Sequence, residues 1–94
     1  MSKIEKIRRK IIDRSYYLSS HAEDEMLDDD LNRKDIEDAI LKGKIFKKYS
    51  EDVRGTRYCI EGTIKDGRKI NMICRFKEDS NLIIITTYAL AEDL

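Results

Sequence analysis

The amino-acid sequence predicts an α+β fold: a small antiparallel meander sheet of about four strands, packed by N-terminal helices on one face. Apolar residues recur at helical spacing as far as Gly43 and alternate along strands after it. Helices followed by a run of strands are typical of this class, because an antiparallel sheet must bury one of its faces. The chain has 94 residues, so residues 1–94 have room for one core and are expected to form a single domain.

Residues 1–15 are predicted to form an N-terminal helix. Isoleucines recur there at the spacing of one helical face, with lysines and arginines on the other: Ile4, Ile7, Ile11 and Ile12. Residues 16–43 are expected to form a helical segment, although Tyr16 to Leu18 interrupt the rhythm and suit a short extended piece. Two capping signals begin helices within it: Ser19 or Ser20, and Asn32 with Asp35. Gly43 is the expected end of the second of these helices.

Residues 44–90 are predicted to form a strand meander. Alternating or continuous apolar residues mark four strands, near residues 45–49, 57–64, 70–76 and 82–85. Lys65-Asp66-Gly67 is typical of a tight turn between the second and third of them. The last strand is apolar on both faces, which suits a central position in the sheet.

The turn at residues 65–67 determines which residues of its two strands face each other. A three-residue loop with Gly67 in the left-handed conformation pairs apolar residues with apolar residues, whereas a two-residue turn would pair them with polar ones. This register joins Ile60 to Met72, Tyr58 to Cys74 and Arg57 to Arg75. A four-residue loop after Lys77 would join Lys77 to Leu82, Arg75 to Ile84 and Asn71 to Tyr88.

The face of the sheet away from the core then carries a polar set: Arg57, Glu61, Asn71, Arg75, Thr86 and Tyr88. Like charges directly opposite are destabilising, so Arg57 facing Arg75 calls for an anion or for a carboxylate such as Glu61. Two guanidiniums beside a tyrosine hydroxyl suit an RNA phosphate. The arginines would stabilise a phosphorane-like transition state, and the tyrosine would orient it or exchange protons. The alternative is an ordinary solvated face with an Arg–Glu ion pair.

The formal net charge is zero, with 19 basic and 19 acidic residues, but the charges are segregated along the chain. Residues 3–14 hold six basic residues and two acids, and residues 23–38 hold nine acids and two basic residues. Residues 42–77 hold eleven basic residues and four acids. A basic sheet face for phosphate, with an acidic helical surface elsewhere, is therefore expected. Alternatively, the segments neutralise each other in the fold.

Several other classes of protein are not indicated. No apolar run approaches the ~20 residues of a membrane span, and the first residues lack the apolar stretch of a signal peptide, so the cytoplasm is expected. One histidine and two cysteines, Cys59 and Cys74, do not make a zinc pattern or a disulfide framework. The acidic cluster lacks calcium-loop spacing, and no phosphate-binding glycine loop is present. No metal and no cofactor is expected.

Several short motifs resemble a bacterial and archaeal family of domains of unknown function: Tyr17-Leu18-Ser19-Ser20-His21-Ala22, Ile40-Leu41-Lys42-Gly43, Gly55-Thr56-Arg57-Tyr58 and Ile84-Ile85-Thr86-Thr87-Tyr88. The resemblance covers about residues 17–89. That family is similar to the RelE, BrnT and MqsR toxins of type II toxin–antitoxin modules, which implies a RelE- or BrnT-like fold. Its members often neighbour zinc-finger antitoxins of the MqsA type, which would be the cognate partner.

The resemblance implies a metal-independent endoribonuclease of the mRNA interferase type. RelE-type enzymes use basic residues on the sheet and a tyrosine near the C-terminus, which here correspond to Arg57, Arg75 and Tyr88. His21 matches the Ser-x-His motif of the family and is a candidate for proton transfer. Candidate RNA-binding residues are the lysines Lys44, Lys47, Lys69 and Lys77. Two features depart from the pattern: the neutral total charge, where RelE toxins are strongly basic, and the absence of a second histidine.

Two hypotheses of different class follow from the sequence. The first is a toxin-like endoribonuclease that acts on RNA and is held by an antitoxin, with a homodimer as a further possibility. The second is a non-catalytic module on the same fold that binds RNA or a protein. Taken without the resemblance, His21 has the alternative role of a packing or helix-capping residue.

Overall fold

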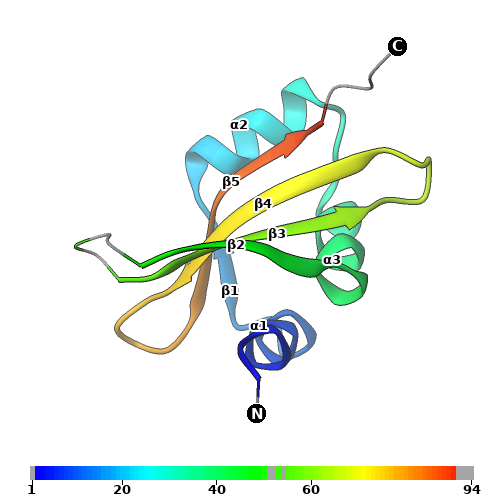
Figure 1. Ribbon diagram of the computed structural model, residues 1–94. Helices are drawn as coiled ribbons and strands as arrows, with labels where there is room; N and C mark the ends of the chain where they lie inside the picture. The colour runs from blue at the N-terminus through cyan, green and yellow to red at the C-terminus, as the bar shows by residue number, and fades with distance from the viewer. Residues whose placement is uncertain (1, 51–52, 54, 91–94) are drawn as a thin grey trace.

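The computed structural model describes residues 2–50, 53 and 55–90 (Figure 1). The ends of the predicted domain, Met1 and residues 91–94, lie outside the described residues, as do residues 51, 52 and 54 of the meander. Three helices are present in the described part: α1 (Lys3–Ile12), α2 (Ser20–Asp28) and α3 (Arg33–Lys42). The strands there are β1 (Tyr16–Leu18), β2 (Lys44–Tyr49), β3 (Arg57–Thr63), β4 (Lys69–Phe76) and β5 (Leu82–Ala89). The α+β class is confirmed.

The sheet differs from the expected one by an additional strand. Its order is β1-β5-β4-β3-β2, and β1 pairs with β5 in parallel while the other pairs are antiparallel. The sheet is therefore mixed and has five strands in the described residues, where the sequence predicted about four antiparallel ones. The interruption at residues 16–18, placed within a helical segment, is this short strand. It pairs only with residues 82–84, so the second half of β5 has β4 on one side and no strand of the described residues on the other.

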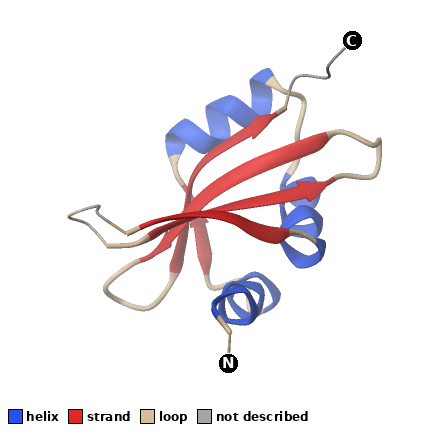
Figure 2. Cartoon of the chain, viewed as in Figure 1, coloured by secondary structure: helices blue, strands red, loops and turns tan. Residues whose placement is uncertain are grey.

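The core lies between one face of the sheet and all three helices (Figure 2). Ile7 and Ile11 bring α1 into it, Ala22 and Met26 bring α2, and Ile36, Ala39 and Ile40 bring α3. Opposite them, Tyr58, Ile60, Met72, Cys74 and Ile84 point from the strands. This arrangement confirms the expected helices on one face, and the other face, here called the open face, carries no helix in the described residues.

The capping signals begin the helices at nearly the predicted positions. Ser19, not Ser20, caps α2, because its hydroxyl accepts a hydrogen bond from the backbone N–H of Ala22 at 3.0 Å. Asn32 and Asp35 form the reciprocal capping box of α3. These contacts satisfy backbone donors that have no partner inside the first turn.

Two glycines let α3 lie directly on the sheet. A Cβ at Gly62 would stand 2.4 Å from the backbone oxygen of Ala39, and one at Gly43 would stand 2.4 Å from that of Glu61. Gly43 ends α3 as predicted, but its φ is −86°, so close approach and not the left-handed conformation requires glycine there. The small side chain of Ala39, fully buried, completes this contact between helix and strand.

The register between β3 and β4 is the predicted one. Arg57 faces Arg75, Tyr58 faces Cys74 and Ile60 faces Met72. The backbone N–H of Gly67 donates to the carbonyl of Ile64 at 2.9 Å, and Gly67 has a φ of 91°, as the three-residue loop requires.

The register between β4 and β5 was predicted correctly at one end only. Asn71 faces Tyr88 as expected, but a β-bulge between Ile73 and Cys74 shifts the rest of the pairing. Arg75 consequently faces Ile83 and not Ile84, and Leu82 faces Phe76 and not Lys77. The bulge adds one residue to β5. As a result, the apolar residues Leu82 and Ile84, which precede the bulge in β5, point to the core face.

Helix α2 supplies side chains to the edge of β5 that β1 does not reach. Glu25 accepts a hydrogen bond from the backbone N–H of Thr87 at 3.3 Å, and Asp29 accepts one from Ala89 at 3.0 Å. The Ser19 hydroxyl donates to the carbonyl of Ile85 at 2.7 Å. Figure 1 shows α2 running beside β5. Acidic side chains of α2 thus bind backbone groups at the edge of β5 that a further strand would otherwise bind. Unpaired edge groups promote pairing with another chain, so these contacts protect the edge.

Candidate nucleic-acid interface

The open face is arranged in rows of side chains that cross the strands. One row contains Tyr49, Arg57, Arg75 and Ile83, taken from β2, β3, β4 and β5 in turn. Here it is called the arginine row. Arg57 and Arg75 are direct cross-strand partners, about 5 Å apart at Cα, and both are half-buried. Two guanidiniums side by side present donors in planar forks that match the oxygens of a phosphate.

Tyr49 is part of the arginine row although the sequence did not indicate it. The guanidinium carbon of Arg57 lies 5.3 Å from the centre of the Tyr49 ring, and Lys47 Nζ lies 5.1 Å from the same ring. A ring face attracts cations and helps to hold them in place. Tyr49 therefore holds Arg57 and Lys47 on one ring, beside the place where two arginines meet. Its position follows from the pairing of β2 with β3, which has a bulge at residues 45–47.

A second row contains Lys44, Glu61, Asn71 and Tyr88. It is called the tyrosine row. Asn71 Nδ2 donates a hydrogen bond to the Tyr88 hydroxyl at 3.1 Å. Asn71 is buried, and its Oδ1 atom has no hydrogen-bond partner among the described residues. The amide thus holds the Tyr88 hydroxyl at a fixed place on the open face.

The two rows lie apart along the strands. Asn71 and Arg75 are separated by four residues of β4, which corresponds to about 13 Å at a rise of ~3.3 Å per residue. Tyr88 was expected to adjoin the arginines, but a middle row of side chains separates it from them. Glu61 also lies in the tyrosine row, and its cross-strand neighbours are Asn71 and Lys44, not an arginine.

The middle row has two apolar side chains at its centre, Cys59 and Ile73, with Lys47 and Thr86 on either side. Cys59 is only 2% exposed even though it points to the open face, so its neighbours cover it completely. Burial raises the pKa of the Cys59 thiol, and the Glu61 carboxylate adds to that shift. The thiol is therefore kept protonated, which argues against a nucleophilic cysteine here. The middle row forms a floor between two polar rows.

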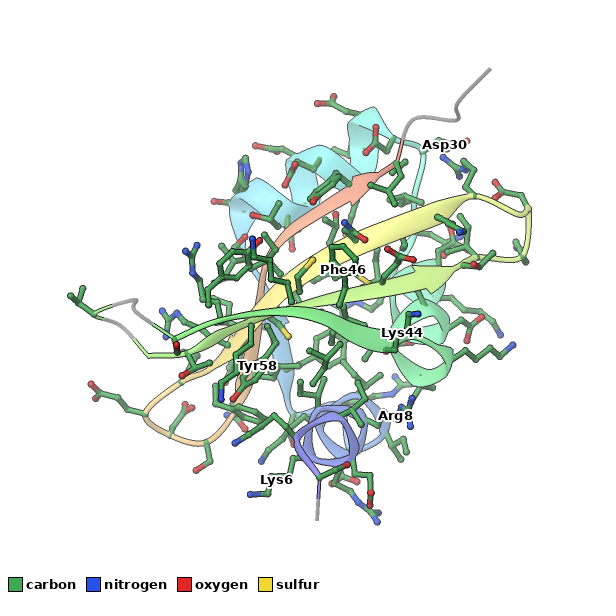
Figure 3. The ribbon with its side chains drawn as sticks, viewed as in Figure 1. Lys6, Arg8, Asp30, Lys44, Phe46 and Tyr58 are labelled. Atoms are coloured by element: carbon green, nitrogen blue, oxygen red, sulfur yellow. The ribbon has the colours of Figure 1, made fainter. Side chains whose placement is uncertain are left out.

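The four candidate RNA-binding lysines lie at the margins of the open face. Lys44 and Lys47 are exposed on the edge strand β2, and Lys69 begins β4 beside the tyrosine row. Figure 3 shows Lys44 and Phe46 on β2. Lys77 follows β4 at the end nearest the arginine row, and its Nζ lies 4.6 Å from the centre of the Tyr17 ring. The lysines therefore extend the positive charge outward from the arginines in two directions.

His21 lies on α2 and not on the open face. Its Nε2 atom is 3.1 Å from Glu25 Oε1, one helical turn away, and its side chain is 66% exposed. Glu25 also accepts the hydrogen bond from Thr87 at the edge of β5. His21 therefore contacts a carboxylate that connects α2 to the sheet. None of its contacts among the described residues joins it to the two arginines.

The described residues hold no group of three histidine, cysteine or acidic side chains that could bind a metal ion. Within the same residues, no helix is both long and apolar enough to cross a membrane.

Comparison with known proteins gives one family. A search of curated proteins and a search of solved structures each found no match to the chain. The model of the family described as "Domain of unknown function (DUF4258)" matches residues 18–89. The match begins after α1 and includes both arginines, Tyr88 and His21. It agrees with the predicted membership of a family of domains of unknown function over residues 17–89. The chain belongs to the family of domains of unknown function DUF4258.

Proposed function

We propose that the open face binds RNA and cleaves it without a metal ion, as in the toxins of type II toxin–antitoxin modules. The observation that carries this proposal is the direct pairing of Arg57 with Arg75 on the open face. Lys47 and Tyr49 enlarge the same cationic site. A phosphate group is the ligand that fits two adjacent guanidinium forks best.

The cleavage is a transesterification within the RNA. The 2′ oxygen attacks the adjacent phosphorus, a P–O2′ bond forms, and the P–O5′ bond breaks with its electron pair leaving on O5′. Glu61 takes the proton from the 2′ hydroxyl, and the Tyr88 hydroxyl gives a proton to O5′. The arginines stabilise the extra negative charge on the phosphorane. No oxidant, metal or cofactor enters the balance.

The geometry sets a condition on this reaction. The arginine row and the tyrosine row are about 13 Å apart, so the reacting phosphate must lie over the middle row, where long side chains from both rows reach it. Ile73 in that row offers an apolar surface for the sugar or base. Tyr49 is the hydroxyl nearer to the arginines along the chain of pairings, and it is the competing candidate for proton exchange.

A cognate antitoxin is the proposed protein partner, with a zinc-finger protein of the MqsA type as the expected class. An antitoxin that inhibits by covering the open face would need acidic groups opposite the arginine row. A homodimer is the other assembly proposed from the sequence.

The experiment is an RNA cleavage assay with the purified chain and four variants: R57A, R75A, Y88F and Y49F. We expect R57A and R75A to lower the cleavage rate by at least 10²-fold, by analogy with removal of one transition-state donor. Y88F should lower it by a similar factor, whereas Y49F should change it little. Cleavage that survives R75A and Y88F would refute the site, and loss with Y49F alone would move the proton exchange to Tyr49.

A second function, binding of RNA without cleavage, is favoured by one observation. The Tyr88 hydroxyl lies across the middle row from the arginines and His21 lies on α2, so neither of these two predicted proton-exchanging groups adjoins the arginine row. On this hypothesis R75A weakens RNA binding, no variant shows cleavage, and expression of the chain does not arrest growth.

A further inference from the structure

A second basic surface lies outside the open face, between α1 and the end of β4. It is a groove of about 380 Å³ that contains five cationic side chains and no acidic one: Lys3, Lys6, Arg9, Lys10 and Lys77, together with Phe76 and Ser80. Here it is called the α1 groove. Four of the five cations come from α1, which precedes the residues matched by the family model.

The ring of Phe76 contributes to the groove and is held by its neighbours. It packs edge-on against Tyr58, with ring centres 6.5 Å apart, and Lys3 Nζ lies 5.5 Å from its centre. An aromatic surface between cations is the combination that single-stranded nucleic acids use, because phosphates meet the charges and bases stack on rings.

The α1 groove adjoins the arginine row. A second groove, of about 720 Å³, contains Arg75, Phe76 and Lys77 with Val53, Glu78 and Asp79. Phe76 and Lys77 belong to both grooves, so they connect Arg75 to α1 around the end of β4. Glu78 and Asp79 stand on the loop side of this connection, and Asp79 is engaged by Asn81. The route of lowest repulsion for a phosphate chain therefore runs past Lys77 toward α1.

The basic side of α1 is free for a ligand, and its apolar side is not. Ile7 and Ile11 are buried in the core, and Arg8 donates to the carbonyl of Gly43 at 2.8 Å, which holds α1 against the end of α3. Figure 3 shows Arg8 on the side of α1 toward α3 and Lys6 on the outer side. A helix that inserts in a membrane surface needs an exposed apolar face. Ile7 and Ile11 of this helix lie in the core, and Ile12, which is 61% exposed, lines a different groove. The described side chains that α1 gives to the α1 groove are all cations.

We infer that the α1 groove binds the phosphates of a single-stranded RNA whose neighbouring segment lies on the arginine row. This inference rests on the proposed RNA-binding function and extends its footprint beyond the family domain. Lys6 and Lys10 contact backbone phosphates without reading sequence, and Lys77 links the two segments.

The test measures binding of 2′-O-methyl RNA, which lacks the 2′ hydroxyl and is not cleaved, as a function of salt. The variant K6Q/K10Q is compared with K34Q/K65Q, which removes the same charge from α3 and from the β3–β4 turn. Glutamine keeps the helix propensity of lysine, so α1 stays folded, and far-ultraviolet circular dichroism checks it. K6Q/K10Q should reduce the slope of log K against log salt by about 1.4 for two single-strand phosphate contacts, and K34Q/K65Q should leave it unchanged.

RNA length separates the groove from the open face. An oligonucleotide of about 12 nucleotides should lose affinity with K6Q/K10Q, whereas one of about four nucleotides, bound at the arginine row, should lose it only with R75A. Equal effects of the two lysine variants on the longer RNA would overturn the inference. The inference would also be overturned if K6Q/K10Q lost binding to vesicles of anionic phospholipid while its RNA binding stayed unchanged. Failure of the proposed function looks different, because R75A would then leave the binding of both RNAs intact.

Discussion

The two faces of the central strands β3 and β4 differ in the kind of side chains that surround their residues. On the covered face, Ile60 and Met72 are fully buried beneath the helices. On the open face of the same two strands, Cys59 and Asn71 are also buried, although no helix of the described residues lies on that face. Burial therefore does not distinguish the faces. What distinguishes them is that one is closed by apolar packing against the helices and the other carries charged and polar rows on either side of the middle row.

The covered face therefore supplies most of the packing that stabilises the fold, and the open face carries the polar groups proposed to act on RNA. Apolar contacts on the covered face tolerate no polar group without a partner. The open face keeps two arginines opposite each other, an arrangement that costs stability. Substitutions on the two faces should consequently separate effects on folding from effects on RNA.

The largest expected effect is on the covered face. Ile60→Ala should lower the free energy of unfolding by about 2–5 kcal/mol, because it leaves a cavity between the sheet and the helices. Ile73→Ala removes the same atoms from the open face, where Ile73 is only half-buried, and should cost less than half as much. Urea denaturation measures both. Equal losses would mean that the open face is as closely packed as the core.

The contact of α3 with the sheet should be the next most sensitive feature. Gly62→Ala places a methyl group 2.4 Å from the backbone oxygen of Ala39, so the helix must move, at a cost of about 1–3 kcal/mol. The control is Gly67→Asn, at a site with no atom within 4 Å of an added Cβ, where the φ of 91° strains any side chain and asparagine is among the least affected. A denaturation midpoint that moves more for Gly67 than for Gly62 would contradict the packing argument.

A third effect depends on pH and concerns the β1 side of the core. Burial, with the hydrogen bond from the Tyr16 hydroxyl to Glu37 at 2.6 Å, raises the pKa of Tyr16 to about 12. An unfolded chain releases this proton near pH ~10, so between pH 10 and 12 the folded state holds a proton that the unfolded state has lost. The stability that Tyr16 contributes is complete below pH ~10 and is lost as the pH rises toward 12.

Tyr16→Phe removes this titration and the hydrogen bond. At neutral pH it should cost about 1 kcal/mol. From pH 10 to 12 the difference between the two proteins should shrink, as measured by denaturation at each pH. Tyr17→Phe, at an exposed tyrosine of the same strand, is the control and should keep the dependence of the wild type. A constant difference between wild type and Tyr16→Phe would show that Tyr16 is not the titrating group.

The smallest effect on stability belongs to the arginine row, and its sign is reversed. Arg75→Gln removes one of two like charges that face each other, and should raise the free energy of unfolding by a few tenths of a kcal/mol. The same variant should weaken RNA binding and flatten its salt dependence, because a phosphate contact is lost. Fluorescence anisotropy and denaturation of the one protein test both. A destabilised variant that binds RNA normally would assign Arg75 a structural role.

The arginine pair shows how much of the site could be predicted from the sequence. Alternation of apolar residues on both sides of a turn with Gly67 at its end leaves one register, and that register alone places Arg57 opposite Arg75. The same reasoning failed beyond Ile73, because a bulge adds a residue that no alternation reveals. Tyr49 was missed for a similar reason, since the bulge in β2 decides which of its residues share a face with Arg57.

Local patterns thus determined the class of fold, the helix caps, the β3–β4 hairpin and the segregation of charge, because each depends on residues a few positions apart. The tertiary structure decided the rest. It paired Tyr16–Leu18 in parallel with β5, placed His21 beside Glu25 at the edge of the sheet, and separated Tyr88 from the arginines by a row of side chains. It also brought the basic side of α1 next to Lys77. These are contacts between distant segments, and their geometry depends on bulges and on the packing of whole helices, which no short stretch of sequence encodes.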